Sequence, residues 1–479
     1  MSEGLLRVQR RGQIPSETLV TIVRKHWPYP VLVGIPAIGL AVVLIVGSRT
    51  LVAGPATATD LAPAARPVLN ATLRIPVFLA QLVAVIAVSR TLGRILRYFG
   101  QPQVVGEMLA GILLGPSVLG LIAPSAYEML FPAGTVRFLN ALSQVGLVLF
   151  MFLVGLDLDA GHLRGRGRLA LLTSHASIMM PMFLGASLAV LLYPAYSTSS
   201  VSFITFALFV GTAMSVTAFP VLARLLAERG LERTQFGTLA IACAAIDDVT
   251  AWCMLGAITT FAADAGVVDL ALSLGALALY MIAMFTVVRR GLRWIIDRAQ
   301  RDGKIGQDAL AVLVAVALAS AWTTDRLGVH ALFGAFIAGV VMPKDELLVQ
   351  SVRGRFEDLL YVLLLPVFFV ATGIRTNLGL LGGSLGILAL TVLVAVAGKL
   401  LGSAIAARAG GMTWRNGFAL GSLLNARGLV GLVVISVGLE AGVISSTIYT
   451  MLIITALLTT FMASPMLSAF HPRAAEAVA

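Results

Sequence analysis

Long apolar runs follow one another along most of the chain. Runs of about 20 apolar residues predict helices that cross a lipid bilayer, because that length spans its hydrocarbon core. The sequence predicts fourteen such spans, at 29–48, 74–92, 103–123, 137–156, 169–193, 201–225, 236–262, 268–288, 307–324, 329–343, 357–375, 380–407, 414–438 and 444–469. We therefore expect an all-α polytopic membrane protein with about fourteen transmembrane helices.

Basic residues alternate between the connections that join these runs. Cytoplasmic connections of membrane proteins are enriched in Lys and Arg. The densest basic run lies within 289–304, whereas 193–200, 262–270 and 438–445 contain no Lys or Arg. The alternation places both termini in the cytoplasm, with a basic segment 1–28 and a short tail 470–479. A bacterial inner membrane is the expected location.

The composition supports a membrane protein and argues against other classes. Only 12% of the residues are charged and the mean hydropathy is +0.95, whereas soluble proteins have about 25% charged residues. The net charge is +11, but the arginines lie between apolar runs and form no stripe with aromatic residues, so no nucleic-acid partner is expected. Cys243 and Cys253 lack metal-site spacing and are expected to pack as small apolar residues.

Two adjacent aspartates are the main candidates for chemistry. Asp247 and Asp248 are the only acidic or basic residues in the apolar run 236–262. A charge near the centre of a spanning helix costs roughly 2.5–3.5 kcal/mol, so such residues usually have a function. Neighbouring helix residues point about 100° apart, so the two carboxyl groups cannot both face one cavity squarely.

Two spans are poorly suited to form continuous helices. The run 211–226 contains Pro220 behind three hydroxyl residues, and the run 421–436 contains several glycines beside polar residues. Proline removes a backbone donor and glycine weakens a helix, although a simple kink or close helix packing would also explain either run. At membrane depth, irregular backbone occurs where it is buried or lines a cavity. The polar residues concerned are Thr212, Ser215, Thr217, Asn425 and Arg427.

The position of these runs predicts an inverted repeat. After one extra N-terminal helix (29–48), six spans occupy 74–262 and six occupy 307–469, with a linker helix at 268–288. The interrupted span is the fifth in each set. Because one odd helix separates the sets, the two repeats insert in opposite orientations, which is the plan of many secondary transporters.

Several motifs, in this order, resemble the second monovalent cation/proton antiporter family. They include QPQVVGEMLAGILLGPSVLG (101–120), GTAMSVTAFPVLARLL (211–226), AIDDVTAW (245–252), GVHALFGAFIAGVVMP (328–343) and NARGLVGLVV (425–434). The resemblance covers about 74–469 and is closest to the cation/H⁺ exchanger branch. It implies the sodium/proton antiporter fold with two broken, crossing helices. It also implies a lipid-embedded homodimer that exchanges Na⁺ or K⁺ for H⁺ without a cofactor.

The family also implies roles for the two aspartates. Asp248 would bind a proton and, transiently, Na⁺ or K⁺. Asp247 would pair with a basic residue, for which Arg375 is the first candidate and Lys399 and Arg427 are rivals. The exchanger branch usually has Asn-Asp at this position, whereas Asp-Asp is closer to the sodium/proton branch, so the ion and the stoichiometry stay open.

Uncharged oxygens near the interrupted runs are further candidate ligands. Thr212, Ser215, Thr217 and Asn425 offer the oxygen atoms that a partly dehydrated alkali cation needs, although such groups also join packed helices. Glu107 is expected to line an access funnel or to remain as a hydrated carboxylate at the interface.

Two other function classes share features with this sequence. A sodium-coupled solute carrier could share this architecture, and it would move an organic solute without obligatory proton flux. Membrane enzymes with intramembrane aspartates need either a second aspartate-rich helix or a GxGD motif, and the sequence contains neither. We therefore expect a transporter and no enzymatic activity.

Overall fold

The computed structural model describes residues 29–54, 74–157, 167–198, 200–232, 234–262, 267–300 and 306–470. The predicted basic segment 1–28 and the tail after Phe470 lie outside these residues. Within the described ranges the chain forms helices and connections, with no β-strand. Eleven of these helices are long and apolar enough to cross a membrane, and three further apolar helices are shorter. The all-α polytopic prediction is confirmed, while the number of crossings stays a prediction.

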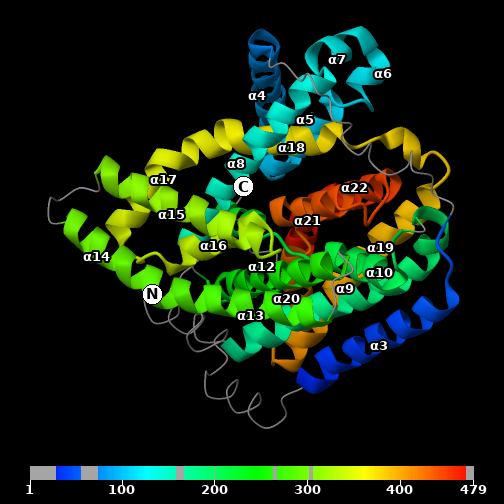
Figure 1. Ribbon diagram of the computed structural model, residues 1–479. Helices are drawn as coiled ribbons and strands as arrows, with labels where there is room; N and C mark the ends of the chain where they lie inside the picture. Colours follow the sequence, from blue (N-terminus) through cyan, green and yellow to red (C-terminus); the bar gives the residue numbers. More distant parts are fainter. Residues whose placement is uncertain are drawn as a thin grey trace, which may run out of the picture.

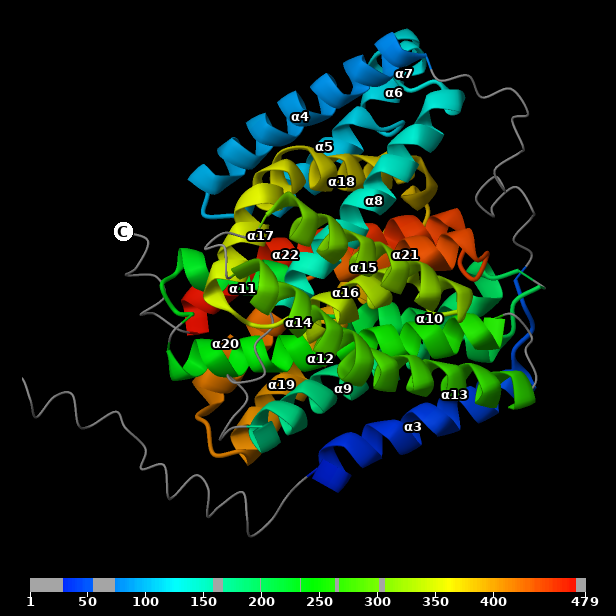
Figure 2. The ribbon, with the colours of Figure 1, turned by 60° about the vertical axis from the view of Figure 1, so that its left-hand side comes forward.

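The helices pack into two bundles (Figures 1 and 2). The scaffold bundle contains α4 (Ile75–Tyr98), α5 (Gln103–Leu114), α8 (Ala133–Asp157), α15 (Gln307–Arg326), α16 (Ala331–Val341), α17 (Glu346–Leu359) and α18 (Leu365–Ile374). The core bundle contains α9 (Gly167–Tyr196), α10 (Phe203–Ser215), α11 (Phe219–Glu228), α12 (Gln235–Ala262), α19 (Leu385–Ala409), α20 (Trp414–Leu424), α21 (Leu429–Glu440) and α22 (Ser446–Phe470).

The remaining helices connect or flank the bundles. The short helices α6 (Leu119–Ile122) and α7 (Pro124–Leu130) follow α5, and a 3₁₀ turn (Leu378–Leu381) follows α18. The predicted extra helix is α3 (Tyr29–Thr50), which packs against α9 and α10, far from α4 in both views (Figures 1 and 2).

The linker helix is longer than predicted. α13 (Val267–Ala283) passes through a π-helical turn (Met284–Val288) into α14 (Arg289–Gln300). The helix continues through the basic run because Leu292 and Ile296 are buried on one face, while the arginines stay on the exposed face. An amphipathic helix of this kind is stable at the edge of a bundle. A second π-helical turn (Leu360–Leu364) joins α17 to α18.

The helix contacts follow the pattern of an inverted repeat. The main contacts occur in pairs when the helices of the first repeat are matched in order with those of the second. The first repeat consists of α4, α5, α8, α9, α10–α11 and α12. The second consists of α15, α16, α17–α18, α19, α20–α21 and α22. α5 packs on α18 as α16 packs on α8, and α9 packs on α10 as α19 packs on α20. The two interrupted helices occupy matching positions, as the sequence predicted.

Glycines allow the closest approaches inside the scaffold bundle. A Cβ atom built on Gly111 would lie 2.5 Å from the carbonyl oxygen of Phe369, and one on Gly339 would lie 2.1 Å from that of Phe152. A Cβ on Gly155 would lie 2.1 Å from the carbonyl oxygen of Phe336. Backbones can therefore touch at both crossings, which is how membrane helices associate without a hydrophobic driving force between them.

Replacing one of these glycines should loosen the scaffold bundle. We expect Gly155→Ala to lower the stability by about 1–3 kcal/mol, because the new methyl group overlaps a backbone oxygen that cannot move freely. The measurement is thermal unfolding of the purified protein in detergent. Gly275→Ala on α13 is the matched control, since nothing lies within 4 Å of its added Cβ. Equal melting temperatures for both variants would contradict the packing argument.

Candidate functional site

The two interrupted helices cross through their non-helical segments. α10 ends at Ser215 and α11 begins at Phe219, while α20 ends at Leu424 and α21 begins at Leu429. The amide of Ala218 donates to the carbonyl of Ala426 at 3.1 Å, so the two breaks touch. Proline in the first turn of α11 explains where that helix starts, because the first-turn amides need no helical partner.

The second break approaches α11 very closely. A Cβ atom on Gly428 would lie 2.4 Å from Val221 Cγ2 and 3.0 Å from Ala218 Cβ. A larger residue at this position would push the two segments apart. The crossing therefore depends on glycine as well as on proline.

Arg427 satisfies the C-terminal end of α10. Its side chain is buried and donates to the carbonyl oxygens of Ala213, at 2.6 Å, and Met214. A positive charge at a helix C-terminus is favourable, because the free carbonyls carry partial negative charge. Its own amide donates to Thr460 Oγ1 at 3.0 Å. Arg427 therefore stabilises the crossing, and the structure does not pair it with Asp247.

The carboxyl group of Asp247 is surrounded by hydrogen-bond donors. Ser174 Oγ donates to Oδ1 at 2.5 Å, while Ser177 Oγ and Thr217 Oγ1 donate to Oδ2 at 3.2 and 2.6 Å. Lys399 Nζ lies 3.2 Å from Oδ2, and both charged side chains are fully buried. A carboxylate with an ion partner and three hydroxyl donors can remain charged at this depth.

Thr217 links this ion pair to the crossing. Its hydroxyl accepts a hydrogen bond from Lys399 at 2.7 Å and lies 3.0 Å from the carbonyl oxygen of Leu424, the last residue of α20. Residue 217 is itself in the break between α10 and α11. The position of Asp247 is thus coupled to both interrupted helices.

Of the three candidate partners for Asp247, Arg375 was the first choice, but the structure places it elsewhere. Arg375 follows α18 in the scaffold bundle, and its Nη1 atom lies 2.6 Å from Glu440 Oε1. Lys399 is the partner because α19 packs along α9, which carries the two serines on Asp247, and places its lysine among them. Lys399 was one of the rival partners in the sequence.

Asp248 has the opposite environment. Its side chain is 1% exposed, yet neither carboxyl oxygen has a hydrogen-bond partner. The backbone amide of Phe219, at the start of α11, makes only a weak contact with the carboxyl group. A buried carboxylate without donors is unstable. This carboxyl group is stable when it carries a proton or binds a cation.

Other polar groups at the two breaks are also free. Thr212 Oγ1 and the Asn425 amide atoms Oδ1 and Nδ2 are buried without a hydrogen-bond partner. Ser215 Oγ donates to the carbonyl of Thr212 at 2.9 Å, which leaves its oxygen able to accept. Thr217 is committed to the ion pair. Thr212, Ser215, Thr217 and Asn425 thus lie at the two breaks, and several of their oxygens are unused.

Glu107 lies away from this cluster, in the scaffold bundle. It is buried in α5 and accepts a hydrogen bond from Gln103 Nε2 at 3.0 Å. Gln103 in turn accepts from Arg224 of α11 at 3.3 Å. This chain of contacts joins the two bundles, and a role in an access funnel stays a prediction.

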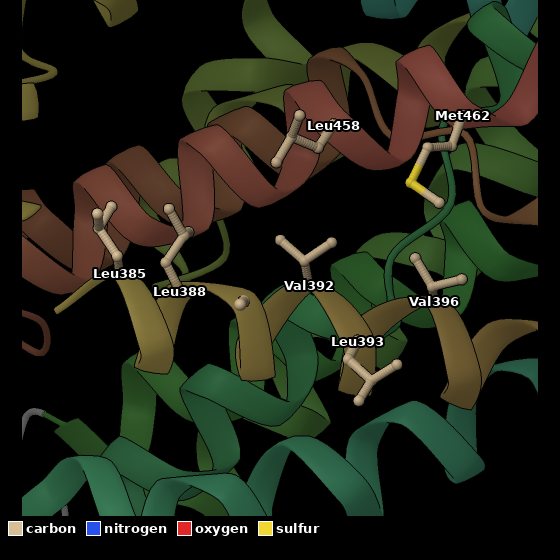
Figure 3. A pocket seen from close by; sticks show the side chains of 8 residues that line it. Leu385, Leu388, Val392, Leu393, Val396, Leu458 and Met462 are labelled. Atoms are coloured by element: carbon tan, nitrogen blue, oxygen red, sulfur yellow. The ribbon is translucent and has the colours of Figure 1, made fainter.

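An apolar cavity lies apart from these polar groups. It has a volume of about 410 Å³, lies between α19 and α22, and is lined only by apolar side chains (Figure 3). Leu385 and Leu393 on its rim are 63% and 64% exposed. Because it offers no oxygen ligand, it is unsuited to bind an inorganic cation.

Sequence reasoning missed Ser174 and Ser177. Neither carries a charge, and small hydroxyl residues are common in membrane helices. Their spacing of three residues within an apolar helix was the available signal, since such positions share one helix face. That face could be assigned to Asp247 only once α9 was placed beside α12.

Comparison with known proteins agrees with this geometry. Residues 82–471 match the sodium/hydrogen exchanger transmembrane family. The Na⁺/H⁺ antiporter NhaS4 of Synechocystis is 39% identical over 401 residues, which cover 83% of this chain and 98% of that protein. Cation/H⁺ antiporter 20 of Arabidopsis thaliana is 35% identical, covering 83% of this chain and 48% of that protein.

Two further proteins extend the comparison. K⁺/H⁺ antiporter 1 of Saccharomyces cerevisiae is 30% identical, covering 84% of this chain and 47% of that protein. The chain therefore spans about half the length of the plant and yeast relatives. The sodium proton antiporter MjNhaP1 of Methanocaldococcus jannaschii shares the fold, with a TM-score of 0.51, 16% identity and coverage of 85% of this chain and 100% of the other. The chain belongs to the sodium/hydrogen exchanger family.

Proposed function

We propose that this protein exchanges Na⁺ or K⁺ for protons across a membrane, and that Asp248 binds the two in turn. The observation that supports this most directly is the contrast within the aspartate pair. Asp247 is saturated with donors, whereas Asp248 is buried at the crossing of two broken helices with none. A carboxyl group without fixed partners can exchange a proton for a cation, because each neutralises it without breaking a hydrogen bond.

Free oxygens at the breaks would complete the cation site. Alkali cations prefer oxygen ligands, and the ends of discontinuous helices supply carbonyls near the middle of the membrane. Thr212, Ser215 and Asn425 have side-chain oxygens that are not engaged as acceptors. Thr217 would hold Asp247 in place and act on the cation only indirectly.

The division into two bundles suits alternating access. The core bundle carries Asp247, Asp248 and both interrupted helices, and it would move against the scaffold bundle to expose the site on each side in turn. We infer that 74–469 form the antiporter domain of a homodimer in a bacterial inner membrane, with both termini cytoplasmic. The arginine distribution and the cyanobacterial relative support this placement.

A sodium-coupled solute carrier is the weaker alternative. Membership of the sodium/hydrogen exchanger family counts against it. The polar groups at the two breaks are also suited to an inorganic ion, since they are few and buried.

Neutralising Asp248 should abolish exchange. In proteoliposomes with an imposed pH gradient, we expect Asp248→Asn to reduce cation-dependent proton movement to the level of empty liposomes, because an amide cannot bind and release the proton. Na⁺ and K⁺ are tested separately. Asp308→Asn, at the exposed start of α15, is the control and should exchange normally. Full activity in Asp248→Asn would refute the site.

Removing Lys399 should destabilise the protein far more than removing Arg375. We expect Lys399→Met to cost about 3–5 kcal/mol, since it leaves the buried charge of Asp247 without its partner. Arg375→Gln should cost about 1 kcal/mol or less, because its ion pair is partly exposed. Thermal unfolding in detergent measures both.

A double variant tests the cause of that loss. Asp247→Asn combined with Lys399→Met removes both charges and should recover most of the stability lost by Lys399→Met alone. If the double variant is less stable than either single variant, the charge pairing is not what Lys399 contributes.

A further inference from the structure

An ion pair joins the two bundles at one end of the molecule. Arg375 Nη1, just after α18 of the scaffold bundle, lies 2.6 Å from Oε1 of Glu440, the last residue of α21 in the core bundle. The two side chains are 26% and 49% exposed. Partly exposed pairs are weak, so a movement of one bundle against the other can separate them.

A small polar cavity adjoins this ion pair. Its volume is about 20 Å³, which is enough for one water molecule or one particle of similar size. It lies between α8, α18 and α21, and both bundles contribute polar groups to its lining. Besides the ion pair, these are Asn140, Ser143, Gln144, Thr372 and Ser436. Amide, hydroxyl and carboxylate oxygens are suitable ligands for an alkali cation.

Among the described residues, single hydrogen bonds join the two bundles close to this ion pair. Tyr449 of α22 donates to the carbonyl of Thr372 at 3.0 Å, and the amide of Asn377 donates to Thr450 at 3.2 Å. These contacts are compatible with separation at this end. Because Arg375 would then leave with the scaffold bundle, Glu440 would be left as an unpaired carboxylate at the mouth of the opening.

We propose that Glu440 is a second cation site, which attracts Na⁺ or K⁺ when this end opens, and that Arg375 replaces the cation when it closes. The proposal rests on the exchange and bundle movement inferred above. In this conformation the guanidinium group occupies the place of the cation. When the bundles separate, the Glu440 carboxylate and the Ser436 hydroxyl bind a cation from solution and deliver it toward Asp248.

The two members of the pair should then have opposite effects. Glu440→Gln should raise the apparent KM for the cation by up to about fivefold, the factor expected for a partly exposed charge interaction. Arg375→Gln should lower it, because Glu440 then stays free. Glu440→Asp keeps the charge and should remain near the wild type. Exchange is measured in right-side-out and inside-out vesicles, and the shift should occur only at the face that bears the pair.

Ionic strength provides a second measurement. Choline chloride screens the charge of Glu440, so the difference between wild type and Glu440→Gln should shrink as its concentration rises. Glu357→Gln is the matched control, since Glu357 is a similarly exposed carboxylate paired with Arg353 within α17. Its apparent KM should not change at the face that bears Arg375 and Glu440.

Other outcomes would overturn the proposal. If Glu440→Gln and Arg375→Gln shift the apparent KM in the same direction, or if neither changes it, the pair is only a brace between the bundles. Melting temperatures confirm that each variant is folded, and the comparison of Glu440→Gln with Glu440→Asp decides the question without the arginine variant. A wild type that exchanges no alkali cation would instead refute the proposed function, and this site with it.

Discussion

Backbone groups in the middle of a bilayer must find partners within the protein, and the crossing of the two interrupted helices meets this requirement with few hydrogen bonds. Ala218 and Ala426 pair across the breaks, and Arg427 binds the carbonyls that end α10. The positive charge of Arg427 is therefore used to stabilise the backbone. Because these groups are satisfied, the remaining side chains at the crossing are free to bind an ion.

The aspartate pair shows how sharply neighbouring residues on one helix can differ. The carboxyl group of Asp247 is fixed by two serines of α9, by Lys399 of α19 and by Thr217 from the break between α10 and α11. Asp248 points in a different direction, toward the start of α11, where only the backbone amide of Phe219 makes a weak contact with it. One carboxyl group is thus held by fixed partners within the core bundle, and the other is not. The angle of about 100° between adjacent helix residues produces this division.

Contacts inside the scaffold bundle differ from the contacts between the two bundles. Within the scaffold bundle, glycines bring backbones into contact at the α5–α18 and α8–α16 crossings, so that bundle resists deformation. Contacts between the bundles include single hydrogen bonds and the exposed ion pair of Arg375 with Glu440. Such contacts break more readily than interlocked backbones. Relative movement of two rigid bodies is therefore the motion that this packing favours.

The sequence by itself determined the membrane-spanning character, the repeated interruption and the presence of an acidic pair, Asp247 and Asp248, inside an apolar helix. These features are readable because lipid requires long apolar runs and makes buried charges and broken helices costly. Only the tertiary structure decided which basic residue pairs with Asp247 and that Ser174 and Ser177 hold it. Hydropathy shows which segments lie in the membrane but not which helices are neighbours. Asp247 pairs with Lys399 and not with Arg375, because α19 lies against α9, whereas α18 belongs to the other bundle.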